Sequence, residues 1–153
     1  MSLENMTKDQ LQRLIDSIKQ YRRVAIAYSG GIDSTLLLYA AKEALGSVNV
    51  IALTLVSPVI PANVVSNCRS LLKTPFLRGI VHKEIPADPL QWDEFVENSK
   101  ERCYLCKKKM YSLLIATIKD ETGSPYILLD GTNLDDTKED RPGRKALQEL
   151  NIK

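Results

Sequence analysis

The segment from Val24 to Leu45 constrains the fold most, because a short apolar run breaks at two glycines and then resumes as a helical pattern. Residues 24–28 (VAIAY) are continuously apolar, which is typical of a parallel strand buried on both faces. Residues 29–31 (Ser-Gly-Gly) interrupt this run, and residues 34–45 favour a helix that Gly46 ends. A buried strand that passes through glycines directly into a helix indicates an α/β fold.

The rest of the chain repeats this alternation of helix and strand. An amphipathic helix begins at Thr7 and carries apolar residues at spacings of three and four. We expect further strands over 48–56, 79–85 and 126–129, and further helices over 62–73, 88–98, 104–121 and 144–150. This order predicts one domain, residues 1–153, built as a doubly wound, Rossmann-like parallel sheet with helices on both faces.

Composition narrows the partners and the compartment. The formal net charge of +2 is too small to favour nucleic acid or an anionic membrane surface as the main partner. No apolar run approaches the roughly 20 residues that span a bilayer, and the charged N-terminus lacks the apolar core of a signal peptide. We therefore expect a cytoplasmic protein without a membrane partner.

The glycine turn can bind phosphate. Glycines 30 and 31 allow positive φ and a close approach of a ligand to main-chain N–H groups, and the following helix directs its positive end at the turn. Ser29, Ser34 and Thr35 add hydroxyl groups. The alternative is that the two glycines only make a tight turn. Asp33 would repel phosphate unless a cation intervenes, which predicts Mg²⁺ between Asp33 and the phosphate oxygens. No lysine follows these glycines, which argues against a Walker-type phosphoryl transferase.

A second unusual loop, DGTNLDDTKEDRPG, follows the fourth strand and should lie at the same edge of the sheet. We expect Gly131 and Thr132 to contact nucleotide, although a plain turn is the alternative. Asp136 is a candidate metal ligand or a turn cap. Asn133 and Arg141 are candidates for binding substrate, and an exposed salt bridge is the alternative for Arg141.

The cysteines fall into two groups. Cys68 lies in an apolar helix and should be part of the core. Cys103 and Cys106 form a C-x-x-C pair near a helix start, which indicates redox, metal or sulfur chemistry, with two small buried residues as the alternative. The helix N-terminus and lysines 107–109 should lower a thiol pKa there. We expect His82, the only histidine, to be a strand residue, and Trp92 to serve packing.

The motif SGGIDS at residues 29–34 resembles the signature of the PP-loop ATP pyrophosphatases. That resemblance implies an adenine nucleotide alpha hydrolase-like fold, a loop that holds the β,γ-pyrophosphate of ATP, and attack of an acceptor oxygen on the α-phosphate. Asp33 and Ser34 would then be catalytic, and adenine would lie near the end of the second strand. The expected ATP-binding residues are Ser29, Gly30, Gly31, Ile32, Asp33, Ser34, Thr35, Thr54, Gly131 and Thr132.

Residues 101–150 resemble the LarE family, through RCYLCK, the strand leading into DGTNLDD, and the RPG segment that follows. The resemblance implies adenylation of a carboxylate on a pyridinium mononucleotide, followed by sulfur insertion in which Cys103 and Cys106 take part. A cluster held by this pair and a further cysteine absent from this chain is one sulfur source that the family suggests. Family members continue beyond the length of this chain with a last strand, so we expect self-association or a C-terminal partner chain.

Two alternatives remain open from the sequence. One is a PP-loop enzyme of another branch, acting on tRNA or with ammonia. The other is a non-catalytic nucleotide-binding module, although such a module has little use for a carboxylate such as Asp33 beside pyrophosphate.

Overall fold

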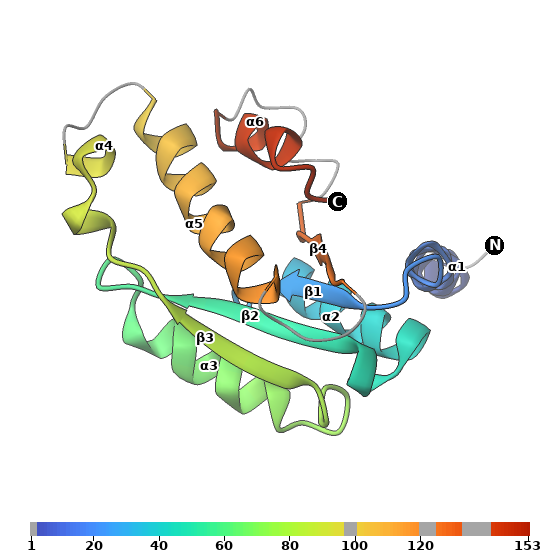
Figure 1. Cartoon of the computed structure of the whole chain (residues 1–153). Helices are drawn as coiled ribbons and strands as arrows, with labels where there is room; N and C mark the ends of the chain where they lie inside the picture. Colours follow the sequence, from blue (N-terminus) through green and yellow to red (C-terminus); the bar gives the residue numbers. More distant parts are fainter. Residues whose placement is uncertain (1–2, 97–100, 120–124, 133–141) are drawn as a thin grey trace.

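The computed structural model describes residues 3–96, 101–119, 125–132 and 142–153 (Figure 1). Its strands form a four-stranded, fully parallel sheet in the order β3-β2-β1-β4. The elements along the chain are α1 (Leu3–Ile18), β1 (Val24–Ala27), α2 (Ile32–Leu45), η1 (Ser47–Asn49), β2 (Val50–Val56), α3 (Ala62–Leu72), β3 (Val81–Pro86), η2 (Pro89–Gln91), α4 (Asp93–Val96), α5 (Arg102–Lys119), β4 (Ile127–Leu129) and α6 (Pro142–Glu149).

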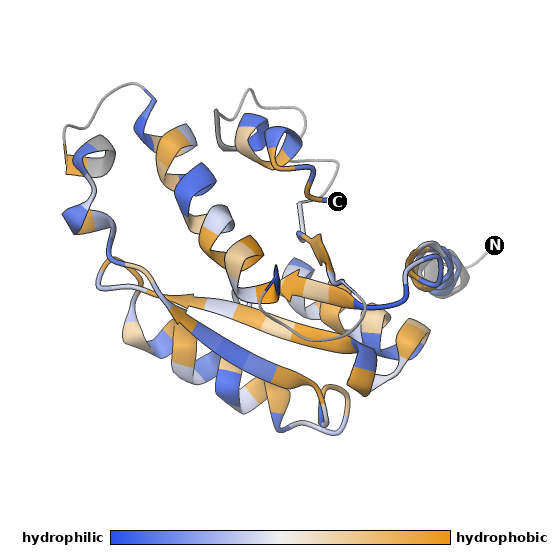
Figure 2. Cartoon of the chain, viewed as in Figure 1, coloured by the Kyte–Doolittle hydropathy of each residue, from blue (hydrophilic) through white to orange (hydrophobic). Residues whose placement is uncertain are grey.

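Helices cover both faces of the sheet, as the sequence predicted. On one face, Ile26 of β1 packs with Leu38 of α2 and Cys68 of α3. On the other face, Leu53 of β2 packs with Leu114 of α5. Successive strand residues point to opposite faces, so a strand buried on both sides must be apolar throughout. Figure 2 shows this as mostly hydrophobic colouring along β1 and β2.

The central strands fix the register of the sheet. Val24 pairs with Val50 and Ala27 pairs with Leu53, so β1 and β2 end at the same edge. Main-chain bonds also join the C-terminal residue to β4: Lys153 N–H donates to the Leu128 carbonyl over 3.2 Å, and Asp130 N–H donates to the Lys153 carbonyl over 2.8 Å. The loops after β1, β2 and β4 therefore meet at one edge of the sheet.

Several expected boundaries were wrong. The first helix begins at Leu3 instead of Thr7, because the preceding residues include the strong helix formers leucine, glutamate and methionine. Residues 47–49 form a 3₁₀ turn instead of the start of a strand, and Val48 is 80% exposed there. Between 88 and 96 the expected single helix is divided into η2 and α4.

The division at η2 has a local cause. The Asp88 carboxylate accepts a hydrogen bond from Leu90 N–H, and Pro89 occupies the first helical position, as the sequence predicted. The capped turn ends at Trp92, whose extended backbone (φ −100°, ψ 121°) separates it from α4. Trp92 thus lies between two short helices, where Lys109 of α5 lies 5.0 Å from its ring.

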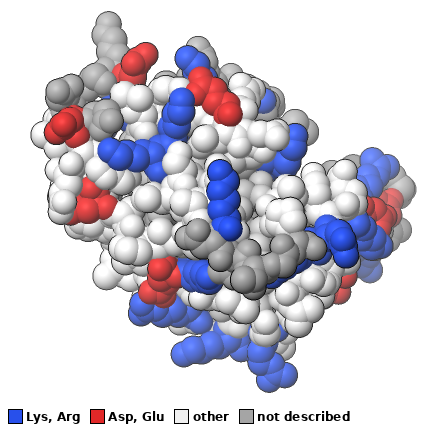
Figure 3. Space-filling model, in the orientation of Figure 1, with Lys and Arg blue, Asp and Glu red and all other residues white. Residues whose placement is uncertain are grey.

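None of the helices in the described ranges is both long and apolar enough to cross a membrane. Basic side chains lie in several separate groups on the face shown in Figure 3, with acidic side chains between them.

Candidate functional site

A cleft of about 500 Å³ opens at the carboxyl ends of β1, β2 and β4. It lies between the loop that follows β1 and the loop that follows β4. The predicted nucleotide residues that line it are Ser29, Gly31, Ile32, Asp33, Ser34, Thr54, Gly131 and Thr132. Apolar side chains from β2, α5 and the residues around α3 complete the wall, among them Leu55, Val64 and Leu114. Two loops about 100 residues apart in sequence therefore form one site.

The loop after β1 turns on Gly30, whose φ of 73° lies in the left-handed region that side-chain-bearing residues avoid. A Cβ at this position would lie 2.9 Å from the Cys68 sulfur. Gly30 does not line the main cleft. It lines an adjoining hollow with polar residues of α3, including Asn63 and Asn67. Glycine is thus required at residue 30 both by the backbone conformation and by contact with α3.

Ser34 stabilises the same loop from within helix α2. It is buried, and its hydroxyl lies 3.3 Å from Ser29 N, 3.2 Å from Ser29 Oγ and 3.2 Å from the Gly31 carbonyl. Thr35, by contrast, is not among the lining residues, and its hydroxyl oxygen is buried without a hydrogen-bond partner in the described part of the chain. Thr35 therefore lies outside the cleft lining, and its contact with ATP stays a prediction.

Gly131 brings the second loop against the N-terminus of α2. A Cβ at Gly131 would lie 3.0 Å from Ser34 N and 3.2 Å from the Asp33 carbonyl carbon. These are main-chain atoms, which cannot rotate away as a flexible side chain can. A side chain at residue 131 would force these main-chain atoms to shift, so glycine favours this approach, which places Thr132 beside the glycine turn.

Sequence analysis missed Asp130 and Tyr111, which hold this second loop. The Asp130 carboxylate accepts hydrogen bonds from the Tyr111 hydroxyl, from the Thr132 hydroxyl and, over 2.9 Å, from Thr132 N–H. Burial, followed by the nearby Asp130 charge, raises the pKa of Tyr111, so this hydroxyl stays protonated and donates. The signal for Asp130 was its position directly between a strand and Gly-Thr, where an aspartate commonly caps a turn.

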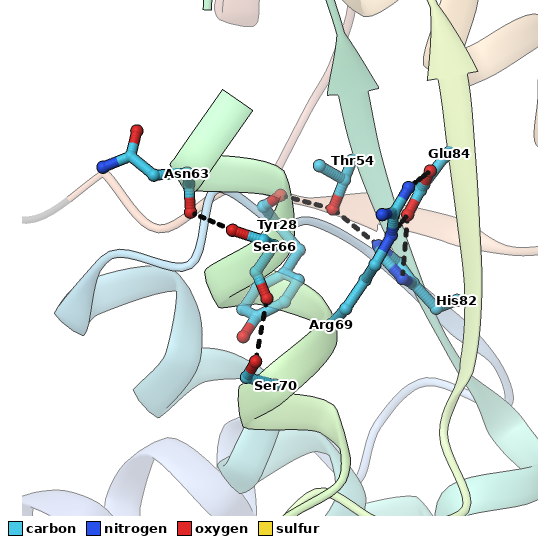
Figure 4. A network of polar contacts seen from close by, with 8 residues as sticks. All are labelled: Tyr28, Thr54, Asn63, Ser66, Arg69, Ser70, His82 and Glu84. Carbon is cyan, nitrogen blue, oxygen red and sulfur yellow. Dashed lines mark hydrogen bonds and ion pairs between the residues drawn. The ribbon is translucent and has the colours of Figure 1, made fainter. Parts of the chain in front are cut away.

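Thr54 lines the cleft, but its hydroxyl group is hydrogen-bonded to other residues of the protein. Its hydroxyl donates to the Tyr28 carbonyl over 2.8 Å and lies 2.8 Å from His82 Nε2 (Figure 4). Thr54 lines the cleft, and its contact with nucleotide stays a prediction. His82 is a strand residue, as expected.

Asp33 is the candidate metal ligand that the structure describes. It occupies the first turn of α2 and lines the cleft. Within the described ranges no three His, Cys, Asp or Glu side chains are grouped to hold a metal ion. Mg²⁺ fits the donor chemistry only if phosphate oxygens complete the set with Asp33. Asn133, Asp136 and Arg141 lie outside the described residues.

The cysteine pair lies at the start of α5 and outside the cleft. Cys103 is exposed and Cys106 is half-buried. Burial is the main cause that raises the pKa of the Cys106 thiol, and the Cys103 thiol adds to it. The expectation of a lowered thiol pKa was therefore wrong for Cys106.

The neighbouring lysines do not offset this effect of burial on the Cys106 pKa. Lys107 lies 5.5 Å from the Tyr111 ring, Lys108 bonds Glu149 at 2.8 Å, and Lys109 lies near Trp92. Lysines adjacent in sequence thus extend to aromatic and acidic partners around the helix. Cys68 is fully buried beneath Gly30, as expected for a core residue, and so does not join the other two cysteines.

Comparison with known proteins gave relatives but no matching family model. The chain is 35% identical over 136 residues to the pyridinium-3,5-bisthiocarboxylic acid mononucleotide synthase of Lactiplantibacillus plantarum, covering 89% of the chain and 48% of that protein. It is 31% identical to an uncharacterized Synechocystis protein (94% and 52% covered) and 33% identical to one from Methanocaldococcus jannaschii (86% and 47% covered). The chain thus spans about half the length of the curated relatives it matches.

Two solved structures share the fold. The NH₃-dependent NAD synthetase of Campylobacter jejuni superposes with a TM-score of 0.64 at 17% identity, over 99% of this chain and 75% of that one. The NMN synthetase of Francisella tularensis superposes with a TM-score of 0.64 at 19% identity, over 82% and 54%. The parallel sheet observed here is the sheet of these proteins.

Proposed function

We propose that the chain belongs to the PP-loop ATP pyrophosphatase superfamily and that its cleft binds ATP and cleaves it between the α- and β-phosphates; the support is the 35% identity to the bisthiocarboxylic acid mononucleotide synthase and the fold shared with the NAD and NMN synthetases. The observation that supports this most strongly is the contact between the two loops. The SGGIDS turn and the DGT turn, distant in sequence, pack main chain against main chain at Gly131 and enclose one cleft.

Different residues of the cleft would bind different parts of ATP. The N–H groups around Gly30 and Gly31 and the N-terminus of α2 would hold the β,γ-pyrophosphate, because a helix N-terminus attracts anions. The hydrogen bond between the Ser29 and Ser34 hydroxyl groups stabilises the conformation of the turn. Asp33 would hold Mg²⁺, which supplies positive charge to the departing pyrophosphate. The adenine ring would occupy the apolar side of the cleft, near the end of β2.

The acceptor we propose is a carboxylate on a pyridinium mononucleotide. A carboxylate oxygen attacks the α-phosphorus, the bond from that phosphorus to the α,β-bridging oxygen breaks, and pyrophosphate leaves. The product is an acyl adenylate. A sulfur nucleophile then displaces AMP and leaves a thiocarboxylate. The support is the 35% identity to a synthase named for a bisthiocarboxylic acid mononucleotide. Asn133 and Arg141 remain our candidates for holding this substrate.

The cysteines of this chain do not by themselves provide a site for the sulfur step. Cys103 and Cys106 do not line the cleft. No third cysteine joins them among the described residues, so we derive no step through a cluster. We propose that residues 1–153 are the adenylating domain, and that delivery of sulfur requires a further cysteine.

The experiment that tests this function varies the acceptor. The chain is incubated with Mg-ATP and, separately, a pyridinium dicarboxylate mononucleotide, ammonium with a carboxylate dinucleotide, or bulk tRNA, and AMP and pyrophosphate are quantified. We expect AMP and pyrophosphate with the pyridinium dicarboxylate, and their loss in Asp33→Asn. AMP formed only with ammonium or only with tRNA would move the chain to another branch of the superfamily. Binding of ATP without turnover under any condition would support a nucleotide-binding module instead.

A further inference from the structure

His82 lies outside the cleft but contacts a residue that lines it. It is part of β3, its side chain is 15% exposed, and it lies on the side of the sheet that α3 covers. Its Nε2 lies 2.8 Å from the Thr54 hydroxyl oxygen. That hydroxyl lies 2.8 Å from the Tyr28 carbonyl oxygen, one residue before the glycine turn. Figure 4 shows Thr54 between Tyr28 and His82.

The direction of each bond in this chain follows from donor counting. A carbonyl oxygen only accepts, so the single hydroxyl proton of Thr54 is directed at Tyr28. The hydroxyl oxygen can then only accept from the ring, so His82 carries a proton on Nε2. In the neutral ring Nδ1 is therefore unprotonated. The opposite tautomer would make Nε2 an acceptor, and His82 would compete with Tyr28 for the Thr54 proton.

Glu84 and Arg69 maintain this tautomer. Glu84 Oε1 lies 4.0 Å from His82 Nδ1, where a free carboxylate would attract a proton to Nδ1. Both Glu84 oxygens, however, accept from Arg69 of α3, at 2.6 and 2.7 Å. This two-bond pair neutralises Glu84 and occupies its oxygens. Burial of the ring is the largest influence on the pKa of His82 and lowers it; the Glu84 carboxylate raises this pKa and the Arg69 guanidinium lowers it, so the ring is neutral near pH 7.

The other groups near the His82 ring do not take the place of its hydrogen bond to Thr54. The Tyr28 ring meets the imidazole edge to face at 6.3 Å, and the Cys68 thiol on α3 lies near Thr54. A thiol sulfur is a weaker acceptor than a carbonyl oxygen, so the Thr54 proton is directed at Tyr28 while His82 donates to the Thr54 oxygen.

Tyr28 determines how the chain enters the glycine turn. Its N–H donates to the Leu53 carbonyl over 2.8 Å, and its own carbonyl accepts from Thr54. Both polar groups of its main chain are therefore fixed to β2, directly before Ser29.

We propose that His82 is a positioning residue of the nucleotide site: by donating from Nε2 to Thr54, it directs the Thr54 proton to the Tyr28 carbonyl and so fixes the glycine turn at residues 29–31. This role rests on the proposed binding of ATP. Because Nε2 carries its proton in both the neutral and the charged ring, the link to Thr54 persists in acid, and His82 does not act as a switch.

The first test reads the tautomer directly. The chain has one histidine, so its imidazole nitrogens give a single pair of ¹⁵N resonances without assignment ambiguity. We expect a protonated Nε2 and an unprotonated Nδ1 near pH 7, and a higher His82 pKa in Arg69→Met, which frees Glu84. The opposite tautomer, or a mixture in fast exchange, would overturn the proposal.

The second test reads the turn and the ligand together. We measure the Mg-ATP dissociation constant and the amide shifts of Gly30 and Gly31 in three variants. His82→Leu removes the donor, and His82→Gln places an amide N–H near the position of Nε2. Ile80→Ala removes a buried core side chain two residues before His82.

The outcomes separate positioning from general destabilisation. In His82→Leu we expect the dissociation constant to rise about tenfold and both glycine amides to shift, as expected for the loss of one hydrogen bond. His82→Gln should recover most of the affinity, and Ile80→Ala should retain it. Equal effects of Leu and Gln, or an equal loss in Ile80→Ala, would overturn the proposal. If the parent chain does not bind ATP, the proposed function fails, and the amide shifts still decide the role of His82.

Discussion

The contact between the glycine turn and α3 allows a quantitative test by a double-mutant cycle at Gly30 and Cys68. Gly30→Ala keeps φ at 73° and adds a Cβ 2.9 Å from the Cys68 sulfur. The left-handed backbone costs an alanine about 1–2 kcal/mol. The overlap costs about 1–3 kcal/mol, because Cys68 is fully buried and has no room to retreat. Reduced freedom of the unfolded chain offsets about 0.4–1 kcal/mol.

These contributions predict that Gly30→Ala loses about 3 kcal/mol of unfolding free energy in the parent chain. In a Cys68→Ala background the sulfur is absent and only the backbone cost remains, so the same change should lose about 1 kcal/mol. The coupling free energy between the two sites is then about 2 kcal/mol, within the range for residues in contact.

Urea unfolding of the four proteins, followed by circular dichroism, measures this coupling from the midpoints and slopes. A cycle that is additive within about 0.5 kcal/mol would contradict the argument, since the Cys68 sulfur would then not limit the space at residue 30. The ATP dissociation constant in the double variant provides a further check. It should remain above the parent value, because alanine at a positive φ still distorts the turn.

Three further predictions test other contacts of the site. Gly131→Ala should weaken ATP binding at least tenfold in titration calorimetry, because its Cβ would meet the main chain of Asp33 and Ser34. Gly46→Ala, at φ 77° and ψ 152° with open space around it, should lose about 1–3 kcal/mol of stability and keep its affinity. Tyr111→Phe should lose about 1 kcal/mol of stability and weaken ATP binding, because it removes the hydrogen bond that holds Asp130. Tyr39→Phe, whose ring packs on Phe76, should leave the ATP affinity unchanged, and equal affinities in both variants would contradict the role of Asp130. Burial lowers the pKa of His82 below its ordinary value of 6.5, so as the pH falls the unfolded chain is protonated at His82 before the folded chain is. The free energy of unfolding should therefore fall as the pH is lowered below 6.5, and this slope should be absent between pH 5 and 6.5 in His82→Gln.

The sequence predicted the order of the elements because periodicity is a local property. The apolar residues of β1 and β2 could only be buried by helices on both faces of the sheet, and the structure has helices there. The glycine turn and the DGT turn were predicted to meet because the carboxyl ends of parallel strands share one edge. Boundaries such as residues 47–49 were wrong, since a single exposed Val48 looks like part of a strand in a one-dimensional pattern.

Side-chain pairings across the sheet could not be predicted. The bond between Thr54 and His82 depends on the register of β2 with β3, where Thr54 pairs with Glu84. The bond between Tyr111 and Asp130 depends on where α5 crosses the sheet. The Cys106 pKa was misjudged because lysines 107–109 were counted by their sequence distance, whereas their side chains extend in different directions around the helix.

The most direct measurement of the central claim is which phosphate bond of ATP breaks. The chain is incubated with Mg-ATP labelled at the α-phosphorus and with the pyridinium dicarboxylate mononucleotide, and the labelled products are separated. We expect label in AMP and in the acyl adenylate, with unlabelled pyrophosphate released. Label in ADP, with release of inorganic phosphate, would contradict it.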